Sequence, residues 1–556
     1  MRRSSTVLAV VLVVLAGIAP AAAAAPADAD AAVSSSDAAA SVQTGNDSAP
    51  PDPESDRIGW ENGYWYNESI DVDQSDGLNE SELDATVARA MARVEVIRGL
   101  EFDMEVPVEI VSRSEFAGSG NSSYNETFRT FDNAKFEALF LIGEDEDSLA
   151  VQQSNRGATV GGYYSPATDS IVLVTDNESS LQVDELTLGH ELVHAVQDQE
   201  FDLGNFSSQT RDGANANSGL IEGDANYVQH QYRQRCAEGG SWAGSCLRPE
   251  ASGGGGGGGP PNMGVYFVNY QPYSDGPAFI AAQKRQGGWE AVNDLYDAPP
   301  ESAEQVIHPD LYGEDPPTEV ELADEHGEDW ERVQPASRLD YAEVGQSGVA
   351  SMFVYPWYAG RSPQGYQAVP NFQNTWFNYT DSGEISRFDP LNYGFDAAAG
   401  WDGDRMHVYR NDAGEGGYVW RLAWDSDAEA TEFRGAYEEL LAYWGAERVS
   451  EDTYRIDEGS FADVFHVTVE DDTVTIVNAP SVGGLTEVRG SVDTEAETPA
   501  PTTGPTETDT PAAETTATES IPPTVTEPSV TTESPGFTAL TALLALLGAA
   551  LLARRR

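Results

Sequence analysis

The sequence predicts an α+β protein, in which helices and strands alternate along the chain without a regular repeat. Three observations indicate this class. Apolar residues recur at helical spacing over 80–101, they alternate or cluster as in strands at 107–111 and 171–174, and they return to helical spacing from Leu186 onward. With 556 residues, of which 40% are hydrophobic, the chain is long enough for two or more domains.

Residues 1–25 have the pattern of a secretory signal peptide. Arg2 and Arg3 precede an apolar run over 7–18, and the small residues at 21–25 fit a cleavage site. The two arginines lack the surroundings of a twin-arginine signal, so the export route stays open. Residues 26–57 are rich in Ala, Ser and Asp, which predicts a disordered acidic leader.

Residues 58–343 are predicted to form the first domain. It begins with an amphipathic helix over 80–101, and a strand follows at 107–111. Residues 161–171 have the pattern of a hairpin that enters the strand at 171–174. Ser179 and Ser180 offer an N-cap for the next helix, with Gln182 in the capping-box position.

This next helix contains the pattern His-Glu-x-x-His, at His190, Glu191 and His194. Residues four apart lie on one side of a helix, so the two imidazoles can bind a single cation. The carboxylate of Glu191 can take a proton from a metal-bound water as that water attacks a carbonyl carbon. Composition alone predicts roughly 0.01 such matches. The alternative is a core helix that happens to carry two histidines.

A catalytic zinc requires a third protein ligand and one open position. Glu222 lies after apolar residues near the start of a second predicted helix, and a carboxylate in that setting needs a cationic partner. Asp224 and Asn226 are predicted to orient the ligands by hydrogen bonds. His230, two turns further along, is the competing ligand. Alternatively, Glu222 is an acid that the helix dipole favours in the first turn.

With the motif at 190–194 and the segment 222–225, the sequence resembles the gluzincin superfamily of zinc metallopeptidases. The segment 190–199 is also similar to one in surface proteins of halophilic archaea. The resemblance implies a zincin-like catalytic domain with two metal-binding helices. His190, His194 and Glu222 would bind Zn²⁺, and the substrates would be peptides or proteins. It also implies that the edge strand before the zinc helix binds a peptide by strand addition.

Gluzincin sites often contain a Tyr or His from the C-terminal part of the domain, which stabilises the developing oxyanion. His308 is the first candidate for this catalytic role, and Tyr312 and Tyr273 follow it. The alternative for His308 is a loop histidine that bonds to the backbone.

Cys236 and Cys246 are the only cysteines in the sequence. Because we expect an exported chain and the two lie close together in sequence, a disulfide is predicted and not a metal site. The glycines at 253–259, which two prolines follow, predict a flexible loop.

Residues 344–490 are predicted to form a second α+β module, either separate from the first domain or as a lobe that closes over the active site. Strands are expected at 401–405, 418–424, 464–469 and 474–477, and a helix is expected over 428–444. His407 and His466 have no acidic or histidine neighbours at ligand spacing. Neither is therefore predicted to bind a metal.

Residues 491–534 are rich in Thr, Pro and Glu, which predicts an extended stalk that O-glycans could decorate. Residues 535–556 contain Pro-Gly-Phe, an apolar run over 538–553 and three terminal arginines. This pattern resembles a Pro-Gly-Phe archaeal sorting signal, which implies removal by an archaeosortase-like enzyme and replacement by a lipid. Without processing, the run would be a transmembrane anchor. Either way, the catalytic domain is expected outside the membrane, at the cell surface.

The net charge of −63, with Lys135 and Lys284 as the only lysines, restricts the partners. Such a surface repels nucleic acid and anionic membranes. An acidic, lysine-poor surface stays hydrated in concentrated salt, and it resembles the surfaces of halophilic proteins. We therefore expect the fold to be lost at low salt. A melting temperature that stays flat from about 3 M to about 0.1 M KCl would contradict this.

Eight Asn-x-Ser/Thr sequons are candidate glycosylation sites on an exported chain. They are Asn46, Asn67, Asn79, Asn121, Asn125, Asn177, Asn205 and Asn378. Asn177 and Asn205 bracket the zinc helix, so glycans there could shape access to it.

Together these patterns predict an exported, surface-anchored zinc metallopeptidase. One alternative is a non-catalytic surface scaffold with a structural zinc site. The other is a pseudoenzyme that binds peptides without cutting them. No pattern in the sequence predicts the substrate, the bond preference or the oligomeric state.

Overall fold

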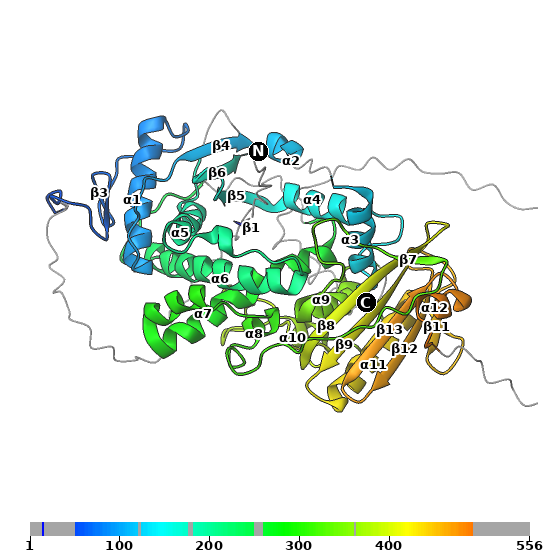
Figure 1. Cartoon of the computed structure of the whole chain (residues 1–556). Helices are drawn as coiled ribbons and strands as arrows, with labels where there is room; N and C mark the ends of the chain where they lie inside the picture. The colour runs from blue at the N-terminus through cyan, green and yellow to red at the C-terminus, as the bar shows by residue number, and fades with distance from the viewer. Residues whose placement is uncertain are drawn as a thin grey trace, which may run out of the picture.

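The computed structural model describes β1 and residues 50–119, 124–175, 182–249, 260–360 and 363–492 (Figure 1). Helices and strands are mixed along the chain, so the predicted α+β class is confirmed. The first elements are β1 (Val14–Leu15), β2 (Trp60–Glu61), β3 (Tyr64–Trp65), α1 (Glu80–Arg98), β4 (Val108–Ser112), α2 (Arg113–Ser119), α3 (Glu126–Ala138), α4 (Ser148–Thr159), β5 (Val160–Ser165), β6 (Ser170–Thr175), α5 (Glu185–Phe201), α6 (Arg211–Cys236), α7 (Met263–Asp297) and α8 (Ala303–Ile307). The remaining elements are β7 (Trp330–Arg332), α9 (Gly345–Val354), α10 (Phe372–Trp376), β8 (Trp401–Asn411), β9 (Gly416–Trp424), α11 (Asp427–Trp444), β10 (Glu447–Arg448), β11 (Thr453–Arg455), β12 (Val464–Glu470), β13 (Thr473–Ala479) and α12 (Val482–Val488).

Several predicted segments lie outside the described residues. They are the signal peptide apart from β1, the leader up to residue 49, the glycine run, the stalk from residue 493 onward and the terminal apolar run. Within the ranges that the structure describes, no helix is both long and apolar enough to cross a membrane.

A small sheet with the strand order β1-β5-β6-β4 lies beside the zinc-motif helix. β5 and β6 form the predicted hairpin, in which Tyr163 pairs with Val172. β4 pairs with β6 in parallel, and β1 lies antiparallel on the other edge of β5. The hydroxyl of Tyr164 on β5 donates to Asp198 of α5 over 2.9 Å. This bond fixes β5 against α5, and Figure 1 shows the sheet directly above α5 and α6.

The zinc-motif helix begins later than predicted. Asp184 is its N-cap and accepts a hydrogen bond from the backbone N–H of Leu186, so the prediction of Ser179 or Ser180 as the cap was wrong. Glu185, the first helical residue, is held by buried arginines. This anchoring sets the position at which α5 can start.

α1 carries three arginines whose side chains are almost completely buried. Arg89 and Arg93 bind Glu185 of α5, with N–O distances of 3.0 and 2.5 Å. Arg98 Nε lies 2.9 Å from Asp224 Oδ2 of α6. A buried charge is costly unless it is paired, so these contacts fix both α5 and α6 relative to α1.

α6 and α7 approach each other most closely at two glycines. A Cβ atom on Gly223 would lie 2.6 Å from the carbonyl carbon of Gly276, so no larger residue fits there without a backbone shift. The short distance brings α7 directly against the middle of α6. Tyr273, one turn before Gly276, therefore reaches Glu222 on α6.

The C-terminal part of the chain is built on a seven-stranded antiparallel sheet with the order β10-β11-β12-β13-β9-β8-β7. It lies at the opposite end of the molecule from α1 (Figure 1). The strands predicted at 401–405, 418–424, 464–469 and 474–477 are β8, β9, β12 and β13, and the predicted helix is α11.

One hydrophobic core crosses residue 343, where the sequence predicts the domain boundary. The ring of Phe140, which follows α3, lies 6.0 Å from that of Tyr437 on α11 and 5.4 Å from that of Phe465 on β12. Phe267 of α7 packs against Trp376 with ring centroids 5.2 Å apart. The C-terminal sheet is therefore packed against the helices that hold the candidate site, and β7 joins it from before residue 343.

Candidate metal centre

His190, Glu191 and His194 lie on the buried side of α5, and none of them is accessible to solvent. The spacing of four residues brings the imidazoles together, as predicted from the helix geometry. His190 Nε2 and His194 Nε2 are 3.0 Å apart. Because two unprotonated ring nitrogens would repel at this distance, a proton or a cation has to lie between them.

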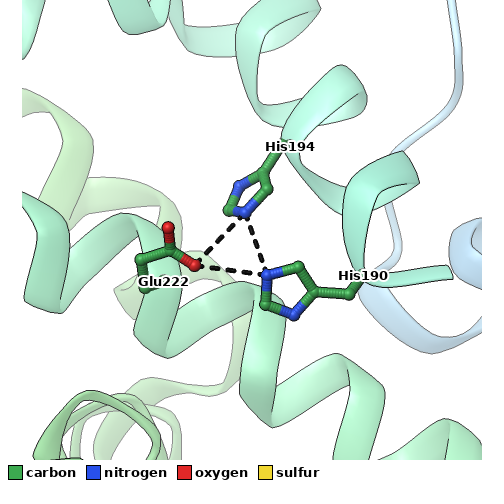
Figure 2. A group of neighbouring side chains, drawn as sticks. All are labelled: His190, His194 and Glu222. Atoms are coloured by element: carbon green, nitrogen blue, oxygen red, sulfur yellow. Dashed lines mark hydrogen bonds and ion pairs between the residues drawn. The ribbon is translucent and has the colours of Figure 1, made fainter. Parts of the chain in front are cut away.

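Glu222 joins the pair from the middle of α6 (Figure 2). Its Oε2 atom lies 3.2 Å from His190 Nε2 and 3.3 Å from His194 Nε2. The ligand atoms around a tetrahedral zinc ion lie roughly 3.4 Å apart, as follows from metal–ligand distances of about 2.1 Å. The three atoms here lie slightly closer together than that. Among the described residues, no other group of three His, Cys, Asp or Glu side chains is arranged in this way.

The position of Glu222 excludes one of the two interpretations given above. α6 begins at Arg211, with Thr210 as its N-cap. Glu222 is therefore about three turns inside the helix, where the helix dipole no longer favours an acid. The partners of its carboxylate are the two imidazoles and Tyr273.

The pKa values of the two histidines and Glu222 are shifted in different directions. Burial lowers the pKa of His190 to about 4. Burial also lowers the pKa of His194, but the charge of Glu222 and the hydrogen bond to it outweigh this effect and raise that pKa to about 9. Burial raises the pKa of Glu222, but the charge of His194 and the bonds to both rings bring it to about 2. The carboxylate is therefore ionised and faces a cation at neutral pH.

Glu191 differs from its neighbours because its carboxylate is buried without a normal hydrogen bond to either oxygen. A Cβ on Gly162 of β5 would lie 3.5 Å from Glu191 Oε1, so the strand backbone passes close to this carboxylate. Burial raises the pKa of Glu191 to about 8, and the negative charge of Glu222 also raises it. The charge of His194 and the backbone N–H of Tyr164 act in the opposite direction. A carboxylate with these properties is suited to accept and return a proton near neutral pH.

Gln197 orients the imidazole of His194. Its Oε1 lies 2.9 Å from His194 Nδ1, and its Nε2 donates to the backbone carbonyl of Ile221 over 3.0 Å. Because an amide oxygen only accepts, His194 carries a proton on Nδ1, and its Nε2 atom faces the cluster. The sequence does signal this role, since Gln197 lies three residues after His194.

Asp224 was predicted to bind a metal ligand directly, but it binds Gln197, which in turn binds His194. Its Oδ2 accepts hydrogen bonds from Gln197 over 3.3 Å and from the hydroxyl of Tyr296 over 2.9 Å. Arg98 of α1 binds the same oxygen. The side chain thus fixes Gln197, and through it His194. Nothing in the sequence identifies Arg98 or Tyr296 as members of this network.

Tyr273 of α7, which the sequence ranked behind His308, is the candidate that contacts the cluster. Its hydroxyl donates to Glu222 Oε1 over 2.8 Å, so it lies at the cluster. His308 ranked first, but its Nε2 lies 3.0 Å from the amide nitrogen of Gln346 on α9. Within the described part of the chain, no hydrogen bond or ion pair connects His308 to the two histidines or Glu222. The ring nitrogen bonds to a side chain and not to the backbone, so neither interpretation of His308 describes its contact.

The remaining candidates also lie away from the cluster. Tyr312 donates to the carbonyl of Ala298. His230 lies beside the amide of Gln234, 3.0 Å away, on a further turn of α6. Asn226 donates to the main-chain carbonyl of Glu222 over 2.8 Å. This bond supports the helix backbone. Asn226 was predicted to orient a ligand side chain, but its amide binds the main chain of Glu222 and not its carboxylate.

Two segments of the chain match known protein families. Residues 331–489 match the family described as Domain of unknown function (DUF8575). Residues 534–556 match the PGF-CTERM motif. The chain carries a C-terminal sorting signal. It is therefore an exported cell-surface protein of the haloarchaeal type, anchored through its C-terminus and processed by an archaeosortase-like enzyme.

The DUF8575 match covers the C-terminal sheet and leaves out α5 and α6. It therefore does not bear on the metal centre. No curated protein and no solved structure matches the chain.

Two further features bear on an exported chain. Cys236 and Cys246 form a disulfide directly after α6, with Cα atoms 5.8 Å apart. Among the sequons, Asn67, Asn79, Asn125 and Asn205 are exposed, while Asn46, Asn121 and Asn177 lie outside the described residues. The Nδ2 atom of Asn378 donates to Asp389 and to the carbonyl of Leu391. A glycan on that nitrogen would replace one of the two donated hydrogens.

Proposed function

We propose that this surface protein is a zinc-dependent peptidase. One observation carries the proposal: two histidines and a glutamate present three ligand atoms close to zinc spacing, next to a buried glutamate without a hydrogen-bond partner of normal geometry. A structural zinc site would need a fourth protein ligand. It would have no use for Glu191.

The residues present fit a zinc ion. His190 and His194 offer Nε2 atoms and Glu222 offers Oε2, which are nitrogen and oxygen donors of the kind found in catalytic zinc sites. When bound, the ion supplies a Lewis acid that polarises a carbonyl and lowers the pKa of a water molecule.

Glu191 would act as the general base and then as the general acid. It would accept the proton of the attacking water and return it to the leaving amine. Its raised pKa supports the second step, because the protonated carboxyl is then stable near neutral pH. Tyr273 holds Glu222 through its hydroxyl, and it would be the donor to the developing oxyanion.

β5 offers a surface on which an extended peptide could lie. Its outer edge already accepts a strand, since Val14 and Leu15 pair there in antiparallel orientation. Gly162 keeps a side chain out of the space between this strand and Glu191, since a Cβ there would lie 3.5 Å from Glu191 Oε1. A peptide added at this edge would pass close to the general base.

Two substitutions separate the roles. Glu191→Gln is expected to keep zinc and to reduce turnover by several orders of magnitude, because the base is lost and the ligands are not. His194→Ala is expected to lose the metal. The measurements are zinc content and digestion of a peptide library in high salt, before and after chelation. Equal loss of zinc in both variants would contradict these roles.

A third outcome would favour a different function. If the wild-type protein binds zinc and cuts no peptide in the library, the centre is structural or serves peptide binding alone. The surface scaffold and the pseudoenzyme would then replace the peptidase as the best interpretation.

A further inference from the structure

Arg156 lies in the last turn of α4, directly before β5. The junction between these two elements is held by Arg113, whose Nη1 donates to the carbonyls of Gly157 and Val160 over 3.3 and 2.9 Å. The backbone that carries Arg156 is therefore fixed. The side chain is half-buried, and its Nε atom is shielded from solvent.

The surroundings of Arg156 are aromatic. Its guanidinium lies 5.9 Å from the ring centroid of Phe116, and that ring is 5.7 Å from the ring of Tyr163 on β5. Burial lowers the pKa of Arg156, and the neighbouring tyrosines Tyr163, Tyr273 and Tyr124 oppose this shift. Among the described residues, Arg156 has no carboxylate partner and its buried Nε has no hydrogen-bond partner.

This environment is unusual in a chain with 93 acidic and 30 basic residues. The buried arginines of α1 follow the opposite pattern, because Arg89, Arg93 and Arg98 all bind carboxylates. A partly desolvated guanidinium without an anion is costly. An anion from outside the chain would offset this desolvation cost by binding the guanidinium of Arg156.

Two of the tyrosines locate Arg156 relative to the metal centre. Tyr273 bonds to Glu222, one of the three ligands. Tyr163 lies on β5, the strand that passes beside Glu191. Arg156 thus interacts electrostatically with the tyrosine on β5 and with the tyrosine on α7 that bonds to Glu222.

We propose that Arg156 binds a carboxylate of the substrate, so that the enzyme prefers peptides with an acidic group close to the scissile bond. This inference rests on the peptidase function proposed above. A guanidinium donates two parallel hydrogen bonds to a carboxylate, which gives both affinity and selection for the planar anion. Partial burial limits screening, so the preference should persist in concentrated salt, where exposed ion pairs contribute little.

The carboxylate could come from an Asp or Glu side chain or from the C-terminus of the peptide. Matched peptides distinguish the two sources. One pair differs by Glu or Gln near the cleaved bond, and the other pair ends in a free carboxylate or in an amide. The pair that shows a difference in kcat/KM identifies the group that Arg156 binds.

Arg156→Gln should reduce kcat/KM for the preferred acidic peptide by about 10- to 100-fold, as expected for a charge-assisted hydrogen bond. The neutral peptide should be cut at nearly the wild-type rate. Arg156→Lys should restore part of the preference, because it keeps the charge and loses the two-pronged geometry. Arg129→Gln is the matched control on the neighbouring helix α3, since Arg129 is partly exposed and already pairs with Asp147.

Binding provides a readout that does not require turnover. Fluorescence anisotropy would measure the affinity of labelled acidic and neutral peptides for Glu191→Gln protein, with and without Arg156→Gln, in about 3 M KCl. The acidic peptide should bind at least about tenfold more weakly to the double variant. Equal binding of the acidic peptide to both proteins overturns the role of Arg156, whether or not the wild type cuts peptides. If binding depends on Arg156 but the wild type cuts nothing, only the peptidase function fails.

Discussion

Two sets of buried acids stabilise different parts of this molecule in different ways. The paired set consists of Glu185 and Asp224, which bind the arginines of α1. Glu185 also accepts hydrogen bonds from the hydroxyl of Tyr232 over 2.6 Å and from the backbone N–H of Leu247 over 2.7 Å. These acids hold α5 and α6 through ion pairs with the arginines of α1.

The unpaired set consists of Asp212, Glu304 and Asp404, at the junction between the helices and the C-terminal sheet. None of the three forms an ion pair with any residue that the structure describes. Asp404 accepts hydrogen bonds from the backbone N–H of Gly345 and from the indole of Trp420. Burial nevertheless raises its pKa to about 6, and burial together with neighbouring acids raises that of Glu304 to about 9.

The difference shows that charge is used in two ways in one acidic chain. Ion pairs with arginine keep the helices of the candidate metal centre in place, provided that both partners remain. The junction instead relies on acids that are more stable when protonated. The metal centre should therefore depend on individual arginine contacts, and the junction should depend on pH.

Glu185→Gln should give the largest effect, because it leaves two buried guanidiniums without an anion. We expect a loss of about 3–5 kcal/mol in the free energy of unfolding, which is typical when one partner of a buried ion pair is removed. Chemical denaturation in high salt would measure it. Arg434→Met is the control, because Arg434 pairs with Glu438 and Asp452 at a partly exposed site, where about 1 kcal/mol or less is expected. Equal losses would erase the distinction between buried and exposed pairs.

Gln197→Leu should have a smaller effect that is specific to the metal centre. Without the amide, His194 loses the partner that fixes its ring, and zinc affinity should fall by about 10- to 100-fold. Competition with a chelator of known affinity would measure this. Gln199→Leu, on the same helix, serves as control because Gln199 binds the backbone of residues 103 and 104 and not the cluster. An unchanged zinc affinity for Gln197→Leu would show that Gln197 does not couple Asp224 to the metal ligand His194.

Glu304→Gln tests the unpaired set. The pKa of Glu304 is about 9 in the folded protein and 4.5 as a model value. Its contribution to stability is therefore fully present below about pH 4.5 and is lost as the pH rises toward 9. Glutamine resembles the protonated form, so the variant should match the wild type at pH 4.5 and be more stable at pH 8, by about 1–3 kcal/mol.

Denaturation curves at the two pH values would measure the effect of Glu304→Gln. Glu432→Gln, at an exposed position on α11, should change stability little at either pH. A Glu304→Gln protein that is less stable than the wild type at pH 8 would show that the acid is ionised and paired in solution.

The sequence allowed much of the architecture around the site to be predicted. Helical and strand periodicity gave α1, the β5–β6 hairpin and the strands of the C-terminal sheet, because these elements each bury one regular face. The spacing of His190 and His194 predicted their proximity, and the setting of Glu222 identified it as their partner. These inferences depend on local geometry or on the cost of burying a charge.

The contacts between distant elements could not be predicted in this way. Arg98 and Tyr273 reach the candidate site from α1 and α7, and no local pattern distinguishes them from other arginines and tyrosines. His308 illustrates the limit, since the sequence left a catalytic and a loop role open while the packing of α8 on α9 places it against Gln346. Only the tertiary arrangement determines such neighbours.

The aromatic contacts of Phe140 have a practical consequence for anyone who prepares this protein. A fragment that ends before β7 would leave this ring and its neighbours facing water, and the C-terminal fragment would lose the surface that its helix α11 covers. Recombinant pieces cut at the start of the DUF8575 match should therefore aggregate when expressed alone. They should dissolve when the two pieces are produced together and can reassociate.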